Sequence, residues 1–188
     1  MERRDFESLN VLVVDDNHQM LTLIKSILHS FGIKNMKTAT DGADAFKELR
    51  YFAADVVICD WSMSPLDGFD FVRLVRTARD SPNVYVPIIM LTGHTELDNV
   101  MHARDAGVNE FLAKPLTAHA LQSRIEEVMA RPRRYVRAAT YFGPDRRRRK
   151  LASYRGPERR LREATWEDPP NFRNDVLHPD EVEELLKG

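Results

Sequence analysis

A short apolar run that ends in a carboxylate constrains this chain more than any other feature of its sequence. Residues 56–59 read Val-Val-Ile-Cys, and Asp60 follows directly. A run this short and rich in β-branched residues is typical of a strand that is buried on both faces of a parallel sheet. Asp60 is then expected at the carboxyl edge of that sheet, where open α/β sheets bind their ligands.

Other apolar runs also end in polar residues. These runs are residues 11–14 before Asp15 and Asp16, 88–91 before Thr92, and 110–113 before Lys114. Because the carboxyl ends of parallel strands share one edge, the sequence predicts that these side chains gather beside Asp60. Three carboxylates, a hydroxyl and an ammonium group at strand ends indicate a functional site and not a core.

Segments of helical periodicity alternate with these runs. They cover about 17–31, 43–49, 69–75, 96–106 and 117–129, and a further strand is expected near 37–39. Strands that alternate with helices at this spacing predict an α/β fold, with a parallel sheet covered by helices on both faces.

The expected cluster of acids has a specific chemistry. Neighbouring carboxylates raise one another's pKa, and a cation stabilises them together. Hard oxygen ligands suit Mg²⁺. One of the carboxylates can also act as a nucleophile and take up a phosphoryl group. The sequence has no Gly-rich phosphate loop, so a nucleotide is not expected as the direct donor.

The motifs and their order resemble the receiver domain of two-component response regulators. They are Val-Leu-Val-Val-Asp15-Asp16-Asn17, Val-Val-Ile-Cys-Asp60-Trp61, Leu91-Thr92-Gly93 and Phe111-Leu-Ala-Lys114-Pro115. The resemblance covers about residues 9–130. It implies a flavodoxin-like, doubly wound sheet of five parallel strands in the order 2-1-3-4-5.

The resemblance also implies roles for single residues. Asp60 is expected to accept the phosphoryl group, and Thr92 and Lys114 to contact it. Mg²⁺ is the expected cofactor. Asp16, Asp60 and the backbone carbonyl of Ser62 would bind it directly, and Asp15 would help through water. Thr92 and Phe111 would form a switch pair, and the bond from Lys114 to Pro115 would be cis.

The expected function is that of a response regulator, phosphorylated by a histidine kinase or a phosphotransfer protein. Its output would be a protein–protein surface over residues 96–106, 109–112 and 117–129. The same surface could serve self-association. No separate enzymatic output domain is expected beyond self-phosphorylation and autodephosphorylation at Asp60. A degenerate receiver that serves only as a scaffold is a second reading, which the full set of site residues disfavours.

The charge of the chain is segregated. Residues 131–162 hold 13 of the 28 Lys and Arg residues and only Asp145 and Glu158 as acids. They also contain a repeat, Tyr-x-Gly-Pro-acid-Arg-Arg, that begins at Tyr141 and again at Tyr154. The sequence therefore predicts an arm at 1–8, a receiver at 9–130, an Arg-rich extension at 131–162 and an acidic tail at 163–188.

The function of residues 131–188 stays open from sequence. We expect them to be largely irregular, because their apolar content is low. Their arginines could bind nucleic acid, with aromatic residues stacking on bases, or could dock on an acidic protein surface. We favour protein docking or self-association, because no helix-turn-helix pattern follows the receiver. No apolar stretch is long enough to span a membrane. Together with the single cysteine, Cys59, this leads us to expect a cytoplasmic protein with no membrane partner.

Overall fold

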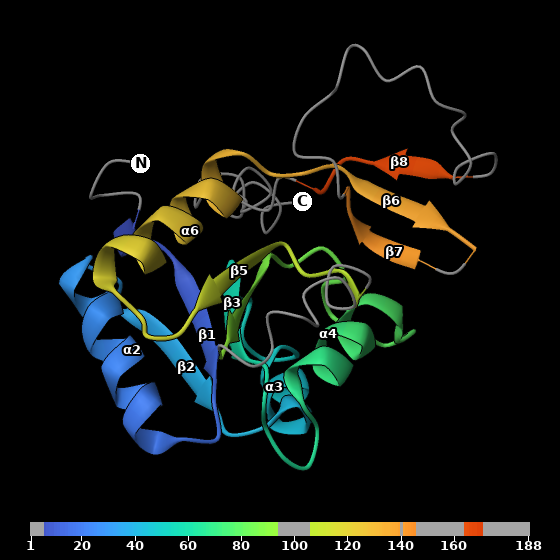
Figure 1. Ribbon diagram of the computed structural model, residues 1–188. Helices are drawn as coiled ribbons and strands as arrows, with labels where there is room; N and C mark the ends of the chain where they lie inside the picture. Colours follow the sequence, from blue (N-terminus) through green and yellow to red (C-terminus); the bar gives the residue numbers. More distant parts are fainter. Residues whose placement is uncertain (1–5, 94–105, 140, 146–163, 171–188) are drawn as a thin grey trace, which may run out of the picture.

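A sheet of five parallel strands lies at the centre of the computed structural model (Figure 1), which describes residues 6–93, 106–139, 141–145 and 164–170. The strand order is β2-β1-β3-β4-β5, which confirms the predicted topology. The strands are β1 (Asn10–Val14), β2 (Asn35–Ala39), β3 (Val56–Asp60), β4 (Ile88–Thr92) and β5 (Glu110–Ala113).

The inner strands are buried on both faces, as the apolar runs predict. Every residue of β3 and of β4 is buried. Alternate side chains of each strand enter two different cores, because successive side chains of a strand point to opposite faces. In β3, for example, Val57 and Cys59 belong to one core, whereas Val56 and Ile58 belong to the other.

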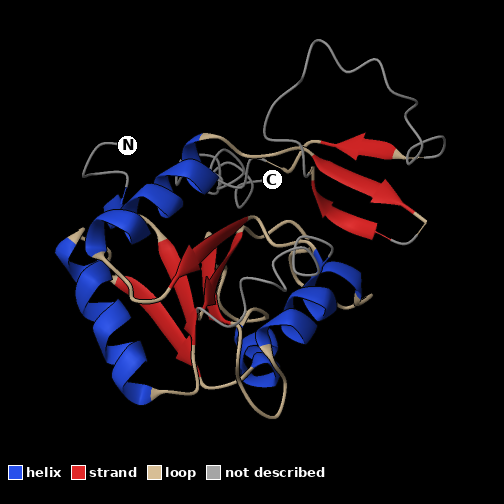
Figure 2. Cartoon of the chain, in the orientation of Figure 1, coloured by secondary structure: helices blue, strands red, loops and turns tan. Residues whose placement is uncertain are grey.

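Two layers of helices cover the sheet (Figure 2). Helices α3 (Gly42–Glu48) and α4 (Gly68–Thr77) pack on one face through residues such as Phe46, Phe71 and Val75. Helices α2 (His18–Ser30) and α6 (Ala118–Ala130) pack on the other face through residues such as Ile24, Leu28 and Ile125. The expected helix at 96–106 lies almost entirely outside the described residues.

Short polar side chains fix where the helices begin. The Asn17 side chain accepts hydrogen bonds from the backbone amides of Gln19 and Met20 at the start of α2. The side chains of Asp41, Asp67 and Thr117 cap α3, α4 and α6 in the same way. These caps satisfy amides that have no partner inside the helix.

The N-terminal segment is better anchored than an arm at residues 1–8 implies. Phe6 is buried, and its ring lies 6.0 Å from that of Phe31, at the end of α2. Leu9 is also buried in the same core. The segment is polar apart from a few residues, so its composition did not indicate that Phe6 anchors it to the core.

The described part of the C-terminal region forms a separate three-stranded antiparallel sheet (Figure 1). Its strands are β6 (Tyr135–Ala138), β7 (Tyr141–Pro144) and β8 (Thr165–Glu167), in the order β7-β6-β8. We call it the C-terminal sheet. The sequence analysis expected a largely irregular tail and predicted none of these short strands, which the buried rings of Tyr135 and Phe142 help to hold.

Among the helices of the described residues, none is both long enough and apolar enough to cross a membrane.

Candidate functional site

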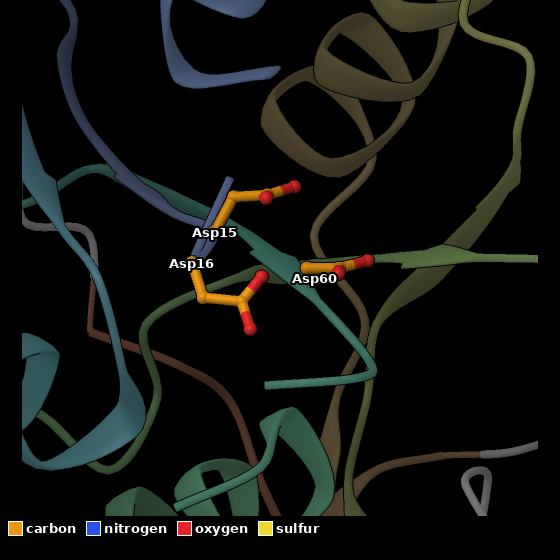
Figure 3. A group of neighbouring side chains, drawn as sticks. All are labelled: Asp15, Asp16 and Asp60. Carbon is orange, nitrogen blue, oxygen red and sulfur yellow. The ribbon is translucent and has the colours of Figure 1, made fainter. Parts of the chain in front are cut away.

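Three carboxylates meet at the carboxyl edge of the parallel sheet (Figure 3). In the pairing of β1 with β3, Val14 lies opposite Cys59, so that Asp15 and Asp60 follow at neighbouring strand ends. Asp16 comes next in the chain. One oxygen from each of the three side chains lies within 4.8 Å of the others. The register of two parallel strands therefore builds the acid cluster that the sequence predicts.

Lys114 brings a positive charge to this cluster from the end of β5. Its Nζ lies 2.6 Å from Oδ1 of Asp60 and 3.5 Å from Oδ2 of Asp15. Its backbone amide donates a hydrogen bond of 2.8 Å to the carbonyl of Thr92, at the end of β4. The site thus joins residues that are up to 99 positions apart in the sequence.

Burial and charge act against each other at Asp60. Its side chain is only 7% exposed, and this burial raises the pKa of the carboxyl group, although the hydrogen bond and charge of Lys114 lower it. Burial lowers the pKa of Lys114, but the hydrogen bond to Asp60 and its charge outweigh burial and raise that pKa. The three carboxylates outnumber the one lysine, so the cluster keeps an excess of negative charge that a cation would offset.

The chemistry of Asp15 fits a bound cation. Its Oδ1 accepts a hydrogen bond of 2.8 Å from the backbone amide of Asn17. Its Oδ2 is buried and forms no hydrogen bond within the described residues, although Lys114 Nζ lies 3.5 Å away, at the distance of a loose ion pair. A buried carboxylate oxygen without a donor is costly unless a cation or water satisfies it. Asp16 beside it is exposed, which leaves an open side from which a hydrated ion can enter.

The predicted switch residues lie on the two strands beside the cluster. Thr92 is fully buried, and its Oγ1 has no hydrogen-bond partner within the described part of the chain. Phe111 on β5 is partly buried and packs against the core that α3 and α4 cover. A hydroxyl without a partner next to Asp60 is able to rotate towards a new acceptor.

The loops around the cluster place the remaining predicted residues. Ser62 is exposed, two positions after Asp60, so the ligand role of its carbonyl stays a prediction. The bond from Lys114 to Pro115 is cis, as the resemblance implies. The bond from Ser64 to Pro65 is also cis, which the sequence did not indicate.

Gly68 supports the site in a way that the sequence analysis missed. Its backbone amide donates a hydrogen bond of 3.0 Å to the carbonyl of Trp61. A Cβ atom at this position would lie 2.1 Å from the carbonyl oxygen of Asp60, closer than two atoms can approach. Only glycine therefore lets the start of α4 pack against the backbone that carries Asp60.

Comparison with known proteins decides the family. A sequence model of the response regulator receiver domain matches residues 11–126. The chain belongs to the response regulator receiver family. All the site residues named above fall within this match, whereas the C-terminal sheet lies beyond it.

Two relatives of this receiver are chemotaxis proteins. The chain is 34% identical over 123 residues to the chemotaxis protein CheY of Pseudomonas aeruginosa, which covers 65% of this chain and 98% of that protein. It is 30% identical over 125 residues to CheY-3 of Vibrio cholerae, covering 66% and 95%.

Solved structures agree with this assignment. A response regulator receiver domain protein from Clostridium thermocellum has a TM-score of 0.59 and 32% identity, covering 65% of this chain and 95% of its own. The receiver domain of a sensor histidine kinase from Pseudomonas aeruginosa has a TM-score of 0.58 and 29% identity, covering 65% and 98%. That structure is described with a magnesium ion coordinated in its active site cleft.

Proposed function

We propose that this receiver accepts a phosphoryl group on Asp60 from a histidine kinase or a phosphotransfer protein. The observation that carries the proposal is the position of Lys114 Nζ, 2.6 Å from Asp60 Oδ1 and beside two further carboxylates. A carboxylate beside an ammonium group is placed to attack phosphorus. The ammonium group can then neutralise negative charge on the transferred phosphoryl group.

The reaction needs little from the protein except position and charge. An Asp60 oxygen forms a bond to phosphorus, while the bond from phosphorus to the donor breaks and the donor keeps that electron pair. Lys114 then lies beside the oxygens of the transferred group. Positioning and electrostatic stabilisation of this kind supply most of the rate in phosphoryl transfer.

Asp15, Asp16 and Asp60 would hold Mg²⁺, with the Ser62 carbonyl as a fourth protein ligand. The unsatisfied Oδ2 of Asp15 supports this assignment. When bound, the ion would neutralise negative charge on the phosphoryl oxygens.

Mg²⁺ is expected to stabilise the folded chain, because folding brings its ligands together. At about ten times its dissociation constant it should add about 1.4 kcal/mol to the free energy of unfolding. Urea unfolding with and without MgCl₂ measures this gain. Asp16→Asn, at an exposed position, should remove most of it, whereas Asp41→Asn, a helix cap outside the cluster, should keep it. An equal gain in both variants would contradict the assigned ligands.

Thr92 and Phe111 would report the phosphorylation state. A phosphoryl group adds about −1.5 to −2 charges and several strong acceptors. The Thr92 hydroxyl, which has no partner among the described residues, would donate to one of these acceptors. The space that it leaves lets the partly exposed ring of Phe111 move inwards. The surface of β5 and α6 then changes shape, which supports a protein as the output partner.

The described arginines of the C-terminal region favour protein contact over nucleic acid. Arg133 pairs with Glu110, Arg134 with Asp168 and Arg137 with Glu167. To bind phosphate, these arginines would have to give up the acids with which they pair. The second candidate function, binding of nucleic acid, therefore depends on the arginines at 146–149, 155, 159, 160 and 162, which lie outside the described residues.

Chemical phosphorylation tests the proposal. Incubation with a small acyl phosphate and Mg²⁺ should add one phosphoryl group per chain, which intact-protein mass spectrometry detects. Hydroxylamine should remove this group, because it cleaves acyl phosphates and leaves phosphate esters of serine and threonine in place. Labelling that resists hydroxylamine, or that does not depend on Mg²⁺, would refute the proposal.

A further inference from the structure

The C-terminal sheet docks on the receiver through a buried polar network. The docking surface is the amino edge of the parallel sheet, which is the edge opposite the acid cluster. It is formed by Val84, Tyr85 and Val86 before β4 and by Gly107 and Asn109 before β5. No part of this contact falls inside the family's own motifs.

Tyr135 of β6 is the anchor of the docked sheet. Its side chain is only 1% exposed. Its hydroxyl donates a hydrogen bond of 2.7 Å to the carbonyl of Tyr85 and accepts one of 3.3 Å from Nδ2 of Asn109. Its ring packs edge-on against that of Tyr85, with 5.1 Å between centroids. A fully buried tyrosine with a satisfied hydroxyl marks a specific interface.

Arg76 holds the receiver side of the interface together. Its buried guanidinium donates to the carbonyls of Val84, Val86 and Gly107 and to Oδ1 of Asn109, at 2.7 to 3.1 Å. The same group lies 5.4 Å from the centre of the Tyr135 ring. The backbones of the two parts also pack closely, since a Cβ on Gly143 of β7 would lie 2.7 Å from Cα of Gly107.

β5 connects this interface with the acid cluster. Glu110, the first residue of β5, is 2% exposed and forms an ion pair with Arg133, just before β6. Lys114, which pairs with Asp60, follows the last residue of the same strand. Four residues of strand span only about 13 Å. The two ion pairs therefore hold opposite ends of one short rigid element.

The switch residue lies within that element. Arg124 of α6 lies 3.8 Å from the Glu110 carboxylate and donates a hydrogen bond of 3.0 Å to the backbone carbonyl of Phe111. Docking thus fixes Glu110, and Glu110 helps to fix the backbone at Phe111. These contacts belong to the state in which Asp60 is a free carboxylate paired with Lys114. A movement of β5 and Phe111 on phosphorylation of Asp60 would therefore have to disrupt these contacts.

We propose that the C-terminal sheet is a built-in regulatory partner of the receiver, and that its docking and the phosphorylation of Asp60 oppose each other through β5. This inference rests on the proposed function. Coupling between two sites is reciprocal, so phosphorylation loosens the docked sheet by the same factor by which docking weakens phosphoryl binding.

Amide hydrogen exchange on the full chain tests the first half of this coupling. Beryllofluoride with Mg²⁺, a mimic of the phosphoryl group, should speed exchange over β6 and β7 by about fivefold or more. Peptides from β2, at the far edge of the parallel sheet, serve as the internal control and should not change. Unchanged or slower exchange over β6 and β7 in beryllofluoride-bound protein would overturn the inference.

Two pairs of matched variants test the reciprocal half. Arg133→Gln breaks the pair with buried Glu110, and its control Arg131→Gln breaks an exposed pair with Glu127. Tyr135→Phe removes the anchoring hydroxyl, and its control is Tyr51→Phe, at a side chain that is 90% exposed. Both test variants should bind beryllofluoride about fivefold or more tightly than their controls.

The outcomes separate this inference from the function on which it rests. If the wild-type chain does not bind beryllofluoride at all, the proposed function fails. If it binds, but both test variants bind like their controls, only the coupling fails. Circular dichroism shows whether each variant is folded. The exchange experiment needs no variant and decides the question even if Arg133→Gln does not fold.

Discussion

Asp60→Asn is expected to abolish uptake of a phosphoryl group. The loss should be roughly a thousandfold or more, the scale that removal of a nucleophile produces. The amide differs from the carboxylate by one atom and keeps its shape, but it is not a nucleophile. The measurement is the rate of labelling by a small acyl phosphate in Mg²⁺, followed by intact-protein mass spectrometry.

Asp41→Asn is a matched control for this result. Asp41 caps α3 at the amides of Ala43 and Asp44, and asparagine caps a helix equally well. This variant should be labelled at the wild-type rate. Labelling that persists in Asp60→Asn would place the nucleophile elsewhere. Asp15, buried in the same cluster, would then be the first alternative.

Arg76→Met is expected to lower the free energy of unfolding by about 3 kcal/mol, because buried carbonyls that lose their donor each cost about 1 kcal/mol or more. The carbonyls of Val84, Val86 and Gly107 would lose the guanidinium that bonds them. Methionine keeps most of the length of the side chain, so the loss of volume is small. Urea unfolding of the full chain, followed by circular dichroism, measures the difference.

Arg73→Met is the control for this prediction, because Arg73 is exposed on the same helix. It should change stability by less than about 0.5 kcal/mol. Burial lowers the pKa of the Arg76 guanidinium, because taking this charge out of water is costly. If Arg76→Met were as stable as Arg73→Met, the relief of that cost would balance the lost hydrogen bonds. Arg76 would then serve to position the interface without stabilising the fold.

The two predictions concern opposite edges of one sheet. Asp60 acts at the carboxyl edge, where parallel strands present ligands, and Arg76 acts at the amino edge, where the C-terminal sheet docks. β5 extends from one edge to the other. The fold thus offers a short path between the acid cluster and a region that the receiver family match does not include.

Most of the fold and the acid cluster could be predicted from the apolar runs that end in Asp15, Asp60, Thr92 and Lys114. Their pattern is local, and the rule that parallel strands share a carboxyl edge turns local pattern into a position in space. The resemblance then supplied the strand order, which the structure confirms. Gly68 was missed because its role depends on an approach to the backbone of Asp60 that no spacing reveals.

The sequence by itself determined a parallel sheet with helices on both faces and an acidic site at its edge. Periodicity and strand-end residues specify these features over a few positions each. Only the tertiary structure decided that Tyr135 packs against Tyr85 and Arg76, and that Glu110 pairs with Arg133. These partners are 23 to 59 positions apart, so no local pattern relates them. In the sequence their polar groups resemble those of surface residues, and only the folded chain shows that they are buried and paired with one another.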